Sequence, residues 1–294
     1  MEEPPVITLC QRATAMTASC ESPESEMRVL YRRSHGDRMI EVLEDDQSRT
    51  LAFDSHLTQS RMAIDDPNRL LLRYTRRMMA GLLFSEAAAG DEPFRVLMVG
   101  LGGGSVAKFL LHHFPACRMD VVEDDPRLPD LARRYFHLPR DVRLNVICED
   151  GASFLDRRES STRYDLILLD AFDQNGAAPG VYAEPMFDLA QGRLTPWGVL
   201  IVNVLRSDRN LFQGVTTGLS RRFPDATLGL SVPGFSNEIL FAGPGVPAWE
   251  RRKSLTGRAR TFEMRLGLNF PSYLDEMARL ERYAPWRRWF GISS

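Results

Sequence analysis

Apolar segments alternate with helical patterns over residues 95–205, and this alternation constrains the fold more than any other feature of the chain. The segments that fit strands are "RVLMVG", "RMDVVE", "RLNVICED", "YDLILLDAF" and "GVLIVNVL". Helical patterns lie between them, at 104–114, 126–136, 151–158 and 184–193. Strands that are apolar almost throughout suit a parallel sheet covered on both faces. We therefore expect a doubly wound α/β domain with right-handed crossovers.

The segments before this region have different patterns. Residues 1–26 are rich in Glu, Ser, Thr and Pro and are expected to form a flexible tail. Over 27–62, short and partly alternating segments separated by turns predict a small antiparallel β-sheet domain. The following stretch, "DDPNRLLLRYTRRMMAGLLF", has helical spacing, with Asp65 or Asp66 as the N-cap and Pro67 in the first turn.

The region after the alternating segments is expected to complete the sheet. A helix at 208–222 precedes two strands, "ATLGLSV" and "NEILFAG". The link "PGFS" between them is too short for a helical crossover, so this pair should be antiparallel. We place the main α/β domain at 63–245 and a basic C-terminal helical tail at 246–294.

Net charge, apolar runs and the spacing of cysteines and histidines limit the partners and the cellular location that we expect. A net charge of -2 gives no reason to expect a nucleic-acid or charged-membrane partner. No apolar run approaches the roughly 18 residues that a membrane span needs, and Met1–Cys20 lacks the pattern of a signal peptide. The four cysteines and five histidines show no ligand spacing, so no metal is expected. We expect a cytoplasmic protein.

Glycines follow the first apolar segment, at Gly100, Gly102, Gly103 and Gly104. Glycine permits positive φ and lacks a Cβ atom, so a flat ligand can lie against this turn. Packing in a tight strand-to-helix turn is the alternative reason for glycine. No Lys or Arg lies in the turn to hold a phosphate. Ser105 stands where the dinucleotide pattern places a third Gly or Ala, but serine costs little there and does not exclude a dinucleotide.

Acidic residues end the next expected strands. Glu123 stands where a carboxylate can accept hydrogen bonds from both ribose hydroxyls. Asp150, after the third strand, can accept one from the adenine amino group. With Asp170 and Asp173, four carboxylates surround one crevice, which would repel a pyrophosphate and suit a cationic sulfonium or amine. For any one of these acids, helix capping remains an alternative.

The loop "LLDAFDQNGAAP" also suggests chemistry, because Asp170 and Asp173 follow a buried strand three positions apart. Two such carboxylates can bind a substrate ammonium, and one of them can take its proton as the amine becomes a nucleophile. A turn with an Asx hydrogen bond is the structural alternative.

The segments "VLMVGLGGGS", "VVEDD", "CEDGASF" and "YDLILLDAFD" together resemble the spermidine synthase (polyamine aminopropyltransferase) family, over roughly 30–245. The resemblance implies a small β domain before a methyltransferase-like Rossmann domain, and a homodimer. It also implies that decarboxylated S-adenosylmethionine is the cofactor and methylthioadenosine the product.

The resemblance also implies roles for individual residues. Gln59 matches a glutamine that lines the nucleoside pocket, Glu123 the ribose-binding acid and Asp150 the adenine-binding acid. Asp170 matches the aspartate proposed to deprotonate the attacking amine, and Asp173 matches its companion, which holds the polyamine. The glycine turn and the neighbours of the two acids complete the cofactor-binding candidates: Gly100, Gly102, Gly103, Gly104, Asp124 and Gly151.

Three departures from the family pattern affect the polyamine half of the site. Gly103 stands where the family usually has the Asp that contacts the aminopropyl ammonium. "NRLLLRY", which ends in Tyr74, replaces a Tyr-His-Glu segment, and Gln174 replaces a Pro. The nucleoside half is retained and the polyamine half is altered.

We expect a spermidine-synthase-like transferase that moves an aminopropyl group to a small polyamine-type amine. An S-adenosylmethionine-dependent methyltransferase is the alternative that Gly103 favours, because glycine leaves room near the amino-acid end of the cofactor. A non-catalytic nucleoside-binding homologue is a third hypothesis. The altered polyamine half favours this third hypothesis, and the pair Asp170 and Asp173 argues against it.

Overall fold

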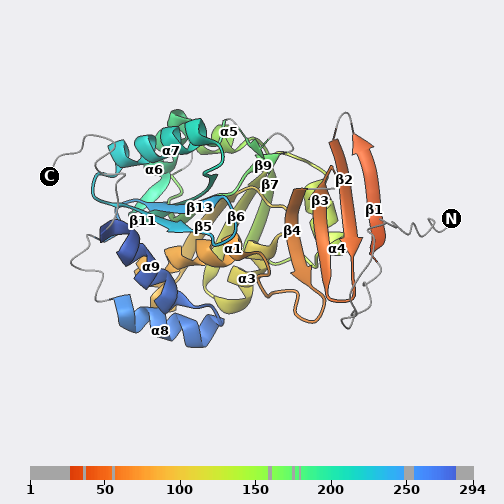
Figure 1. Ribbon diagram of the computed structural model, residues 1–294, viewed down its shortest axis with the longest axis horizontal. Coiled ribbons are helices and arrows are strands. Elements are labelled where there is room, and N and C mark those ends of the chain that lie inside the picture. Colours follow the sequence, from red (N-terminus) through yellow and green to blue (C-terminus); the bar gives the residue numbers. More distant parts are fainter. Residues whose placement is uncertain are drawn as a thin grey trace, which may run out of the picture.

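Two sheets organise the protein, whose computed structural model describes residues 27–35, 38–54, 57–157, 161–173, 176–178, 180–247 and 255–282. A small antiparallel sheet forms one end of the molecule, and a seven-stranded sheet with helices on both faces forms the rest (Figure 1). The expected fold class, a doubly wound α/β domain with a small N-terminal β-sheet, is confirmed. The expected tail at 1–26 lies outside the described residues.

The small sheet has the order β1-β2-β3-β4, with every neighbouring pair antiparallel. Its strands are β1 (Arg28–His35), β2 (Arg38–Glu44), β3 (Ser48–Phe53) and β4 (Leu57–Ala63). One face is apolar and packs on the main domain through a buried cluster of the residues Ile40, Val42, Leu51, Phe53, Met62, Leu128, Leu131 and Phe136. The last three belong to α4 (Leu128–Tyr135) and its C-terminal end.

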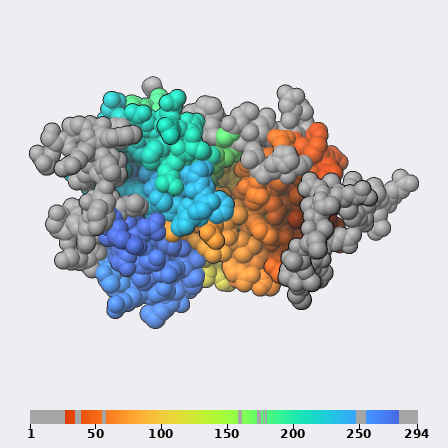
Figure 2. Space-filling model, viewed as in Figure 1, coloured from red at the N-terminus to blue at the C-terminus, as the bar shows by residue number. Residues whose placement is uncertain are grey.

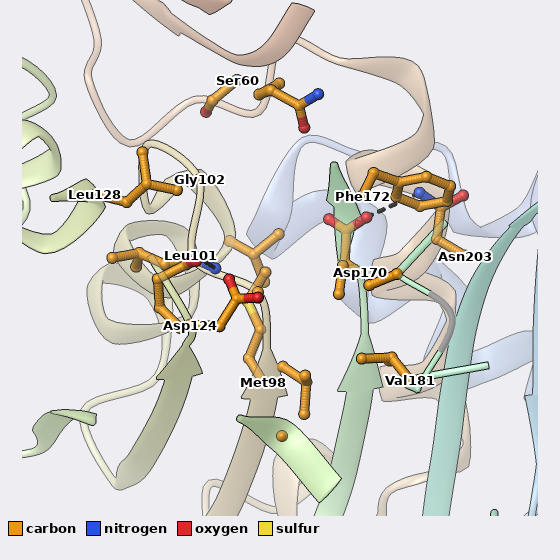
Figure 3. Close-up of a pocket in the computed structure, with 18 of the residues that line it drawn as sticks. Ser60, Met98, Leu101, Gly102, Asp124, Leu128, Asp170, Phe172, Val181 and Asn203 are labelled. Carbon is orange, nitrogen blue, oxygen red and sulfur yellow. Dashed lines mark hydrogen bonds between the residues drawn. The ribbon is translucent and has the colours of Figure 1, made fainter. Parts of the chain in front are cut away.

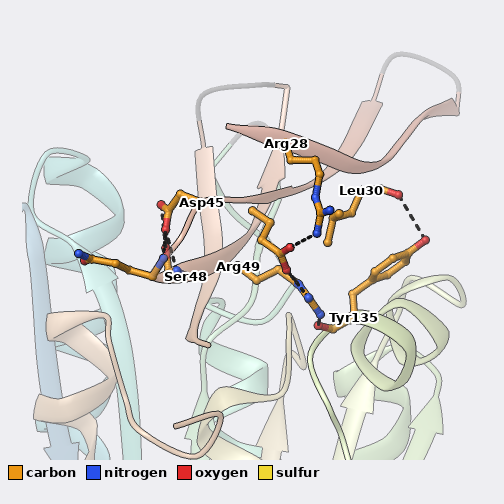
Figure 4. Close-up of polar contacts among 8 residues, drawn as sticks. Arg28, Leu30, Asp45, Ser48, Arg49 and Tyr135 are labelled. Atoms are coloured by element: carbon orange, nitrogen blue, oxygen red, sulfur yellow. Dashed lines mark hydrogen bonds and ion pairs between the residues drawn. The ribbon is translucent and has the colours of Figure 1, made fainter. Parts of the chain in front are cut away.

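Polar contacts tie the small sheet to the C-terminal end of α4 (Figure 4). The Arg49 guanidinium, on β3, donates to the backbone carbonyl of Tyr135 and pairs with the Glu44 carboxylate. Arg28 pairs with the same carboxylate from the exposed side of β1. The Tyr135 hydroxyl donates to the Leu30 carbonyl at 3.5 Å. Arg49 therefore joins the two domains, because one side chain satisfies acceptors from both.

The main sheet has the order β12-β13-β11-β8-β5-β6-β7. Its strands are β5 (Phe94–Val99), β6 (Cys117–Glu123), β7 (Leu144–Cys148), β8 (Tyr164–Leu169), β11 (Leu194–Leu205), β12 (Thr227–Ser231) and β13 (Asn237–Ala242). The first five in chain order are parallel, whereas β13 runs antiparallel to both β11 and β12, as expected from the short link. The chain starts in the middle and winds outward on both sides, so the order reverses between β5 and β8.

Helices cover the two faces of this sheet (Figure 1). One apolar cluster includes residues of α3 (Ser105–His113), and the other includes residues of α5 (Gly151–Leu155), α6 (Glu184–Arg193) and α7 (Arg209–Arg222). Alternate residues of β5 show why both faces are apolar. Val96 and Met98 belong to the first cluster, and Leu97 and Val99 to the second.

The helix expected from Asp65 onward begins later. The described helix α1 (Arg73–Met78) has Leu72 as its N-cap and continues as a 3-10 turn, η1 (Met79–Phe84), before the short α2 (Glu86–Ala89). Neither Asp65 nor Asp66 caps a helix, because the chain first pairs Leu70 with Met62 of β4. That bridge carries the segment past the end of β4, so α1 starts beside the main sheet.

The C-terminal region, which the sequence patterns predict to be helical, contains two helices, α8 (Leu255–Leu266) and α9 (Phe270–Arg282). Phe262 and Phe270 are buried in the main core, so the described part of this region, 255–282, packs on the main domain. Arg265 donates to the His113 carbonyl at 2.6 Å, and Arg77 pairs with Glu276 at 2.9 Å. In Figure 2 these helices (blue) form the lower left of the molecule.

The Arg49 contact predicts a loss of stability on substitution. We expect Arg49→Leu to lower the free energy of unfolding by about 1–3 kcal/mol, because it leaves the Tyr135 carbonyl and the Glu44 carboxylate without a buried partner. Chemical denaturation measures this difference. Arg28→Leu is the matched control: the Arg28 side chain is 69% exposed and pairs with the same carboxylate, so its loss should cost under about 0.5 kcal/mol. Equal costs would contradict a role for Arg49 in joining the domains.

Candidate functional site

A cavity of about 710 Å³ opens at the carboxyl ends of β5, β6 and β8. This edge is where the strand order reverses, the position at which open α/β sheets bind ligands. The opposite wall comes from β4 and α1, including Gln59, Ser60 and Tyr74. Figure 3 shows Ser60 on the same side of the cavity as Gly102, with Asp170 and Asn203 at the other end. The small sheet thus contributes directly to the site.

Most of the residues predicted from the sequence line this cavity: Gln59, Gly100, Gly102, Glu123, Asp124, Asp150, Gly151 and Asp170. Gly103 and Gly104 do not line it. Asp173 lies on β9 (Phe172–Asp173), which pairs with β10 (Gly176–Ala177), and its side chain is outside the described residues.

The glycine turn brings β5 and β8 into close approach. Gly100 has φ +97°, and a Cβ atom there would lie 2.2 Å from the carbonyl oxygen of Asp170. Both the backbone conformation and the space exclude any other residue. Gly104 also has positive φ, at +73°, and it is the N-cap of α3. The turn therefore needs glycine for its own geometry as well as for an approaching ligand.

Gly103 differs from the expectation that its missing side chain leaves room for a cofactor. A Cβ atom at Gly103 would point at Ser60 and Phe136, 2.7 Å from Ser60 Oγ and 3.0 Å from the Phe136 ring. Ser60 Oγ in turn lies 3.0 Å from Ser105 Oγ. The space beside Gly103 is filled by β4 and by the end of α4, so this position packs the two domains together and does not enlarge the cavity.

Glu123 is held by the backbone around it. Its Oε2 accepts a hydrogen bond from the Leu101 N–H at 2.8 Å, and its Oε1 accepts one from the Asp125 N–H at 3.0 Å. Beyond its backbone donor each carboxylate oxygen has a further lone pair, and the Asp124 side chain, which also lines the cavity, contacts this carboxylate as well. Burial raises the pKa of Glu123 to about 7, although the two backbone donors oppose this shift. Hydroxyls that donate to this carboxylate would favour its ionised form.

Asp150 has two roles in the structure. Its Oδ1 accepts from the Ser153 N–H at 2.8 Å, which makes it the N-cap of α5, and it also lines the cavity. The capping alternative and the ligand-binding hypothesis are therefore compatible, because capping engages one carboxylate oxygen. A Cβ atom at the next residue, Gly151, would lie 2.6 Å from a methyl group of Val99, so glycine allows α5 to approach β5.

Asp170 lies at the end of β8, where two neutral donors face it. Asn203 Nδ2 donates to Asp170 Oδ1 at 2.8 Å (Figure 3), and the Tyr74 hydroxyl donates to the same carboxylate. Burial raises the pKa of Asp170 to about 6, against the effect of both donors. Burial also holds the pKa values of Tyr74 and Tyr182 well above 10, so both hydroxyls stay neutral beside this carboxylate. Asp170 is therefore a partly desolvated base that is ionised at neutral pH.

Three of the residues at this end of the cavity were not predicted from the sequence as parts of the site. Asn203 and Asn237 were assigned to strands only, and Tyr74 was noted only as the end of an altered segment. A signal was present for Asn203, which is the one polar residue in the otherwise apolar run "VLIVNVL". No comparable signal marked Asn237, which is the first residue of its strand.

Carboxylates are the only charged side chains among the described residues that line the cavity: Glu123, Asp124, Glu149, Asp150 and Asp170. A site with several carboxylates and no Lys or Arg in its wall attracts cations and repels phosphate and carboxylate groups. At the mouth, Phe235 is 56% exposed, with the Arg73 guanidinium 5.9 Å from the centre of its ring.

Within the described part of the chain, His, Cys, Asp and Glu side chains form no group of three or more that could hold a metal ion. None of the helices in that part has the length and apolar character of a membrane span.

Comparisons with solved structures place the fold beside two kinds of enzyme. A spermidine synthase in complex with the transition state analogue AdoDATO matches 85% of this chain and 85% of its own, with a TM-score of 0.64 and 19% identity. That similarity concerns the fold. Human methyltransferase-like protein 13 in complex with SAH matches 68% of this chain and 93% of its own, with a TM-score of 0.59 and 26% identity.

The sequence comparisons are more specific. The polyamine aminopropyltransferase of Chromobacterium violaceum is 31% identical over 239 residues, which cover 81% of this chain and 88% of that protein. The family model of the spermine/spermidine synthase domain matches residues 73–227, which contain the glycine turn and the acids at the strand ends. The chain therefore belongs to the spermine/spermidine synthase family.

Proposed function

We propose that this protein transfers an aminopropyl group from decarboxylated S-adenosylmethionine to a polyamine-type amine. The observation that carries the proposal is Asp170, a desolvated carboxylate in a cavity whose only charged lining residues, among those described, are acidic. Both substrates of this reaction are cationic, and one of them must lose a proton. Membership of the family and a relative named polyamine aminopropyltransferase support the same reaction.

The nucleoside half of the site fits an adenosine group. Glu123 would accept hydrogen bonds from the ribose hydroxyls through the lone pairs that its backbone donors leave free. Asp150 would accept one from the adenine amino group through the oxygen that does not cap α5. When bound, decarboxylated S-adenosylmethionine supplies a sulfonium-activated carbon, at which a C–N bond replaces the C–S bond and methylthioadenosine leaves.

Asp170 would prepare the acceptor amine. Above pH 6 the Asp170 carboxylate is ionised and can accept a proton from an ammonium group, because its pKa is about 6. Burial beside a sulfonium lowers the pKa of the ammonium group, which reduces the difference that this transfer must overcome. Tyr74 and Asn203 hold the carboxylate by hydrogen bonds from two different elements, so its position is set before the amine arrives.

Three further expectations remain proposals. Asp173, which follows Asp170 on β9, would hold the ammonium group of the acceptor. A homodimer and a cytoplasmic location are expected from the family resemblance and the sequence composition.

A methyltransferase that uses S-adenosylmethionine is the second candidate. The similarity to human methyltransferase-like protein 13 in complex with SAH, at 26% identity, favours it. The charge of the cavity opposes it, because S-adenosylmethionine carries a carboxylate and no Lys or Arg is among the described lining residues. Gly103 no longer supports it, since that position faces Ser60 and Phe136. The non-catalytic hypothesis has against it the perturbed and firmly held Asp170.

Binding measurements distinguish these candidates. We expect titration calorimetry to show tighter binding of decarboxylated S-adenosylmethionine than of S-adenosylmethionine, by about tenfold or more, because the carboxylate of the latter meets acidic side chains. Methylthioadenosine should bind as the common nucleoside part. The reverse order of affinities would favour the methyltransferase, and binding of none of the three would reject the nucleoside site.

Replacement of the base should separate catalysis from binding. We expect Asp170→Asn to lower the rate of aminopropyl transfer by about 10²–10⁴-fold, because an amide cannot accept the proton, while methylthioadenosine binding stays nearly unchanged. Asp156→Asn is the matched control, since this exposed residue lies outside the cavity lining. Full activity of Asp170→Asn would show that Asp170 is not the base.

Binding of the nucleoside should depend on pH through Glu123. Ribose hydroxyls donate to the ionised carboxylate, whose pKa is about 7. We therefore expect the Kd of methylthioadenosine to rise by about tenfold for each pH unit below 7 and to be constant well above it. The same dependence should remain in Asp170→Asn, which removes the other lining carboxylate whose pKa is raised. A Kd that is equal at pH 5.5 and pH 8 would contradict the role of Glu123.

A further inference from the structure

A chain of amide hydrogen bonds crosses three strands and ends on Asp170. Asn237 Nδ2, at the start of β13, donates to Asn203 Oδ1 on β11 at 2.9 Å. Asn203 Nδ2 donates to Asp170 Oδ1 at 2.8 Å. The register of the sheet makes this possible, because β11 lies between β13 and β8, with Asn237 opposite Leu205 and Leu169 opposite Val202.

The direction of the two bonds follows from their ends. An ionised carboxylate only accepts hydrogen bonds, so Asn203 must turn its NH2 group to Asp170 and its carbonyl oxygen away. That oxygen needs a donor, because Asn203 is only 1% exposed and an unpaired buried carbonyl is costly. Asn237 supplies the donor. If the Asn203 amide were rotated by half a turn, its oxygen would face the carboxylate and its NH2 group would face another NH2 group.

We propose that Asn237 is a positioning residue, which holds the Asn203 amide with its NH2 group toward Asp170. From two strands away it thereby favours the ionised form of the catalytic carboxylate. The proposal rests on the proposed function only in calling that carboxylate catalytic. Asn237 also lines the cavity, but the effect described here reaches Asp170 through Asn203.

Among the side chains that the structure describes, no other charged group acts on Asp170. The titratable side chains that face Asp170 are Tyr74, from α1, and Tyr182, from the segment before α6, and both remain neutral. The Ala171 N–H donates to the Tyr182 hydroxyl at 3.3 Å, so Tyr182 is itself held in place. Of the donors to the carboxylate, Tyr74 does not depend on the amide chain, whereas the Asn203 amide keeps its direction only while its oxygen has a partner.

The test measures the ionisation of Asp170 directly in the full-length protein. With aspartate labelled at the carboxyl carbon, NMR titration gives the pKa of Asp170, and the signal missing in Asp170→Asn assigns it. We expect Asn237→Leu, which has a similar shape and no charge, to raise this pKa by about one unit. Asn203→Leu should raise it at least as much. In the double variant, Asn237→Leu should add nothing, because its path to Asp170 is already broken.

Asn145→Leu is the matched control. Asn145 also donates to an aspartate, Asp120, at 3.0 Å, but neither residue is in the cavity lining. This variant should leave the pKa of Asp170 unchanged. If Asn237→Leu shifted the pKa of Asp170 equally in the wild-type protein and in Asn203→Leu, the proposal would be overturned, since Asn237 would then act without Asn203. The absence of any shift in Asn237→Leu would also overturn it. If Asn237→Leu does not fold, Asn237→Ala provides the same comparison with a smaller side chain that cannot donate a hydrogen bond.

Activity gives a second and separate readout. In Asn237→Leu the acid limb of the pH profile for kcat should move upward by the same unit, with the Kd of methylthioadenosine unchanged. A lower kcat with an unmoved limb would indicate a structural role and would overturn the proposal. Failure of the wild-type protein to transfer an aminopropyl group to any amine would reject the proposed function, whereas the NMR cycle would still decide the role of Asn237.

Discussion

The contact between the turn after β5 and the end of β8 is the constraint on which the site depends. Gly100 lies so near the Asp170 carbonyl that a Cβ atom there would be 2.2 Å from the oxygen. This approach occurs between β5 and β8, where the strand order reverses and the connections after the two strands lead to opposite sides. It brings the glycine turn, in the nucleoside half of the site, and the carboxylate of Asp170, the proposed base, to the same cavity. A larger residue at position 100 would push β5 and β8 apart and so separate these two parts of the site.

Buried ionised carboxylates in this cavity lower the free energy of unfolding, and a cation bound beside them offsets this effect. Burial raises the pKa of Glu123 to about 7 and that of Asp170 to about 6. The folded protein therefore binds more protons than the unfolded chain between the ordinary values of these groups and the raised ones. By linkage, the contribution of these two groups to the free energy of unfolding falls as pH rises through that window. A sulfonium or ammonium beside the ionised groups offsets this loss, so the features that destabilise the empty site at neutral pH are those that favour its substrates.

The parts of the structure that follow local rules could be predicted from the sequence. Short stretches of sequence are sufficient to identify the apolar strands, the glycine turn and the acids at the strand ends. Parallel strands then bring their carboxyl ends to one edge of the sheet. For this reason Glu123, Asp150 and Asp170 could be assigned to one crevice. Tyr74, Asn203 and Asn237 could not, because they reach Asp170 from α1, β11 and β13. The start of α1 was also wrong, since the pairing of Leu70 with Met62 overrides a plausible helix start at Asp65 and Asp66.

Gly103 shows why a motif position has to be interpreted together with its neighbours. The absence of the usual Asp suggested an enlarged pocket, but Ser60 and Phe136 fill the space that a side chain would take. Glycine at this position therefore lets Ser60 and Phe136 pack against the turn, and five acidic side chains still line the cavity. Charge selection in this cavity comes from carboxylates at the ends of three strands, β6, β7 and β8, and from the absence of Lys and Arg among its described lining residues. The loss of one Asp therefore changes the electrostatic potential of the cavity little. The proposed base, Asp170, has no such substitute. The contacts that hold it come from residues far apart in the sequence.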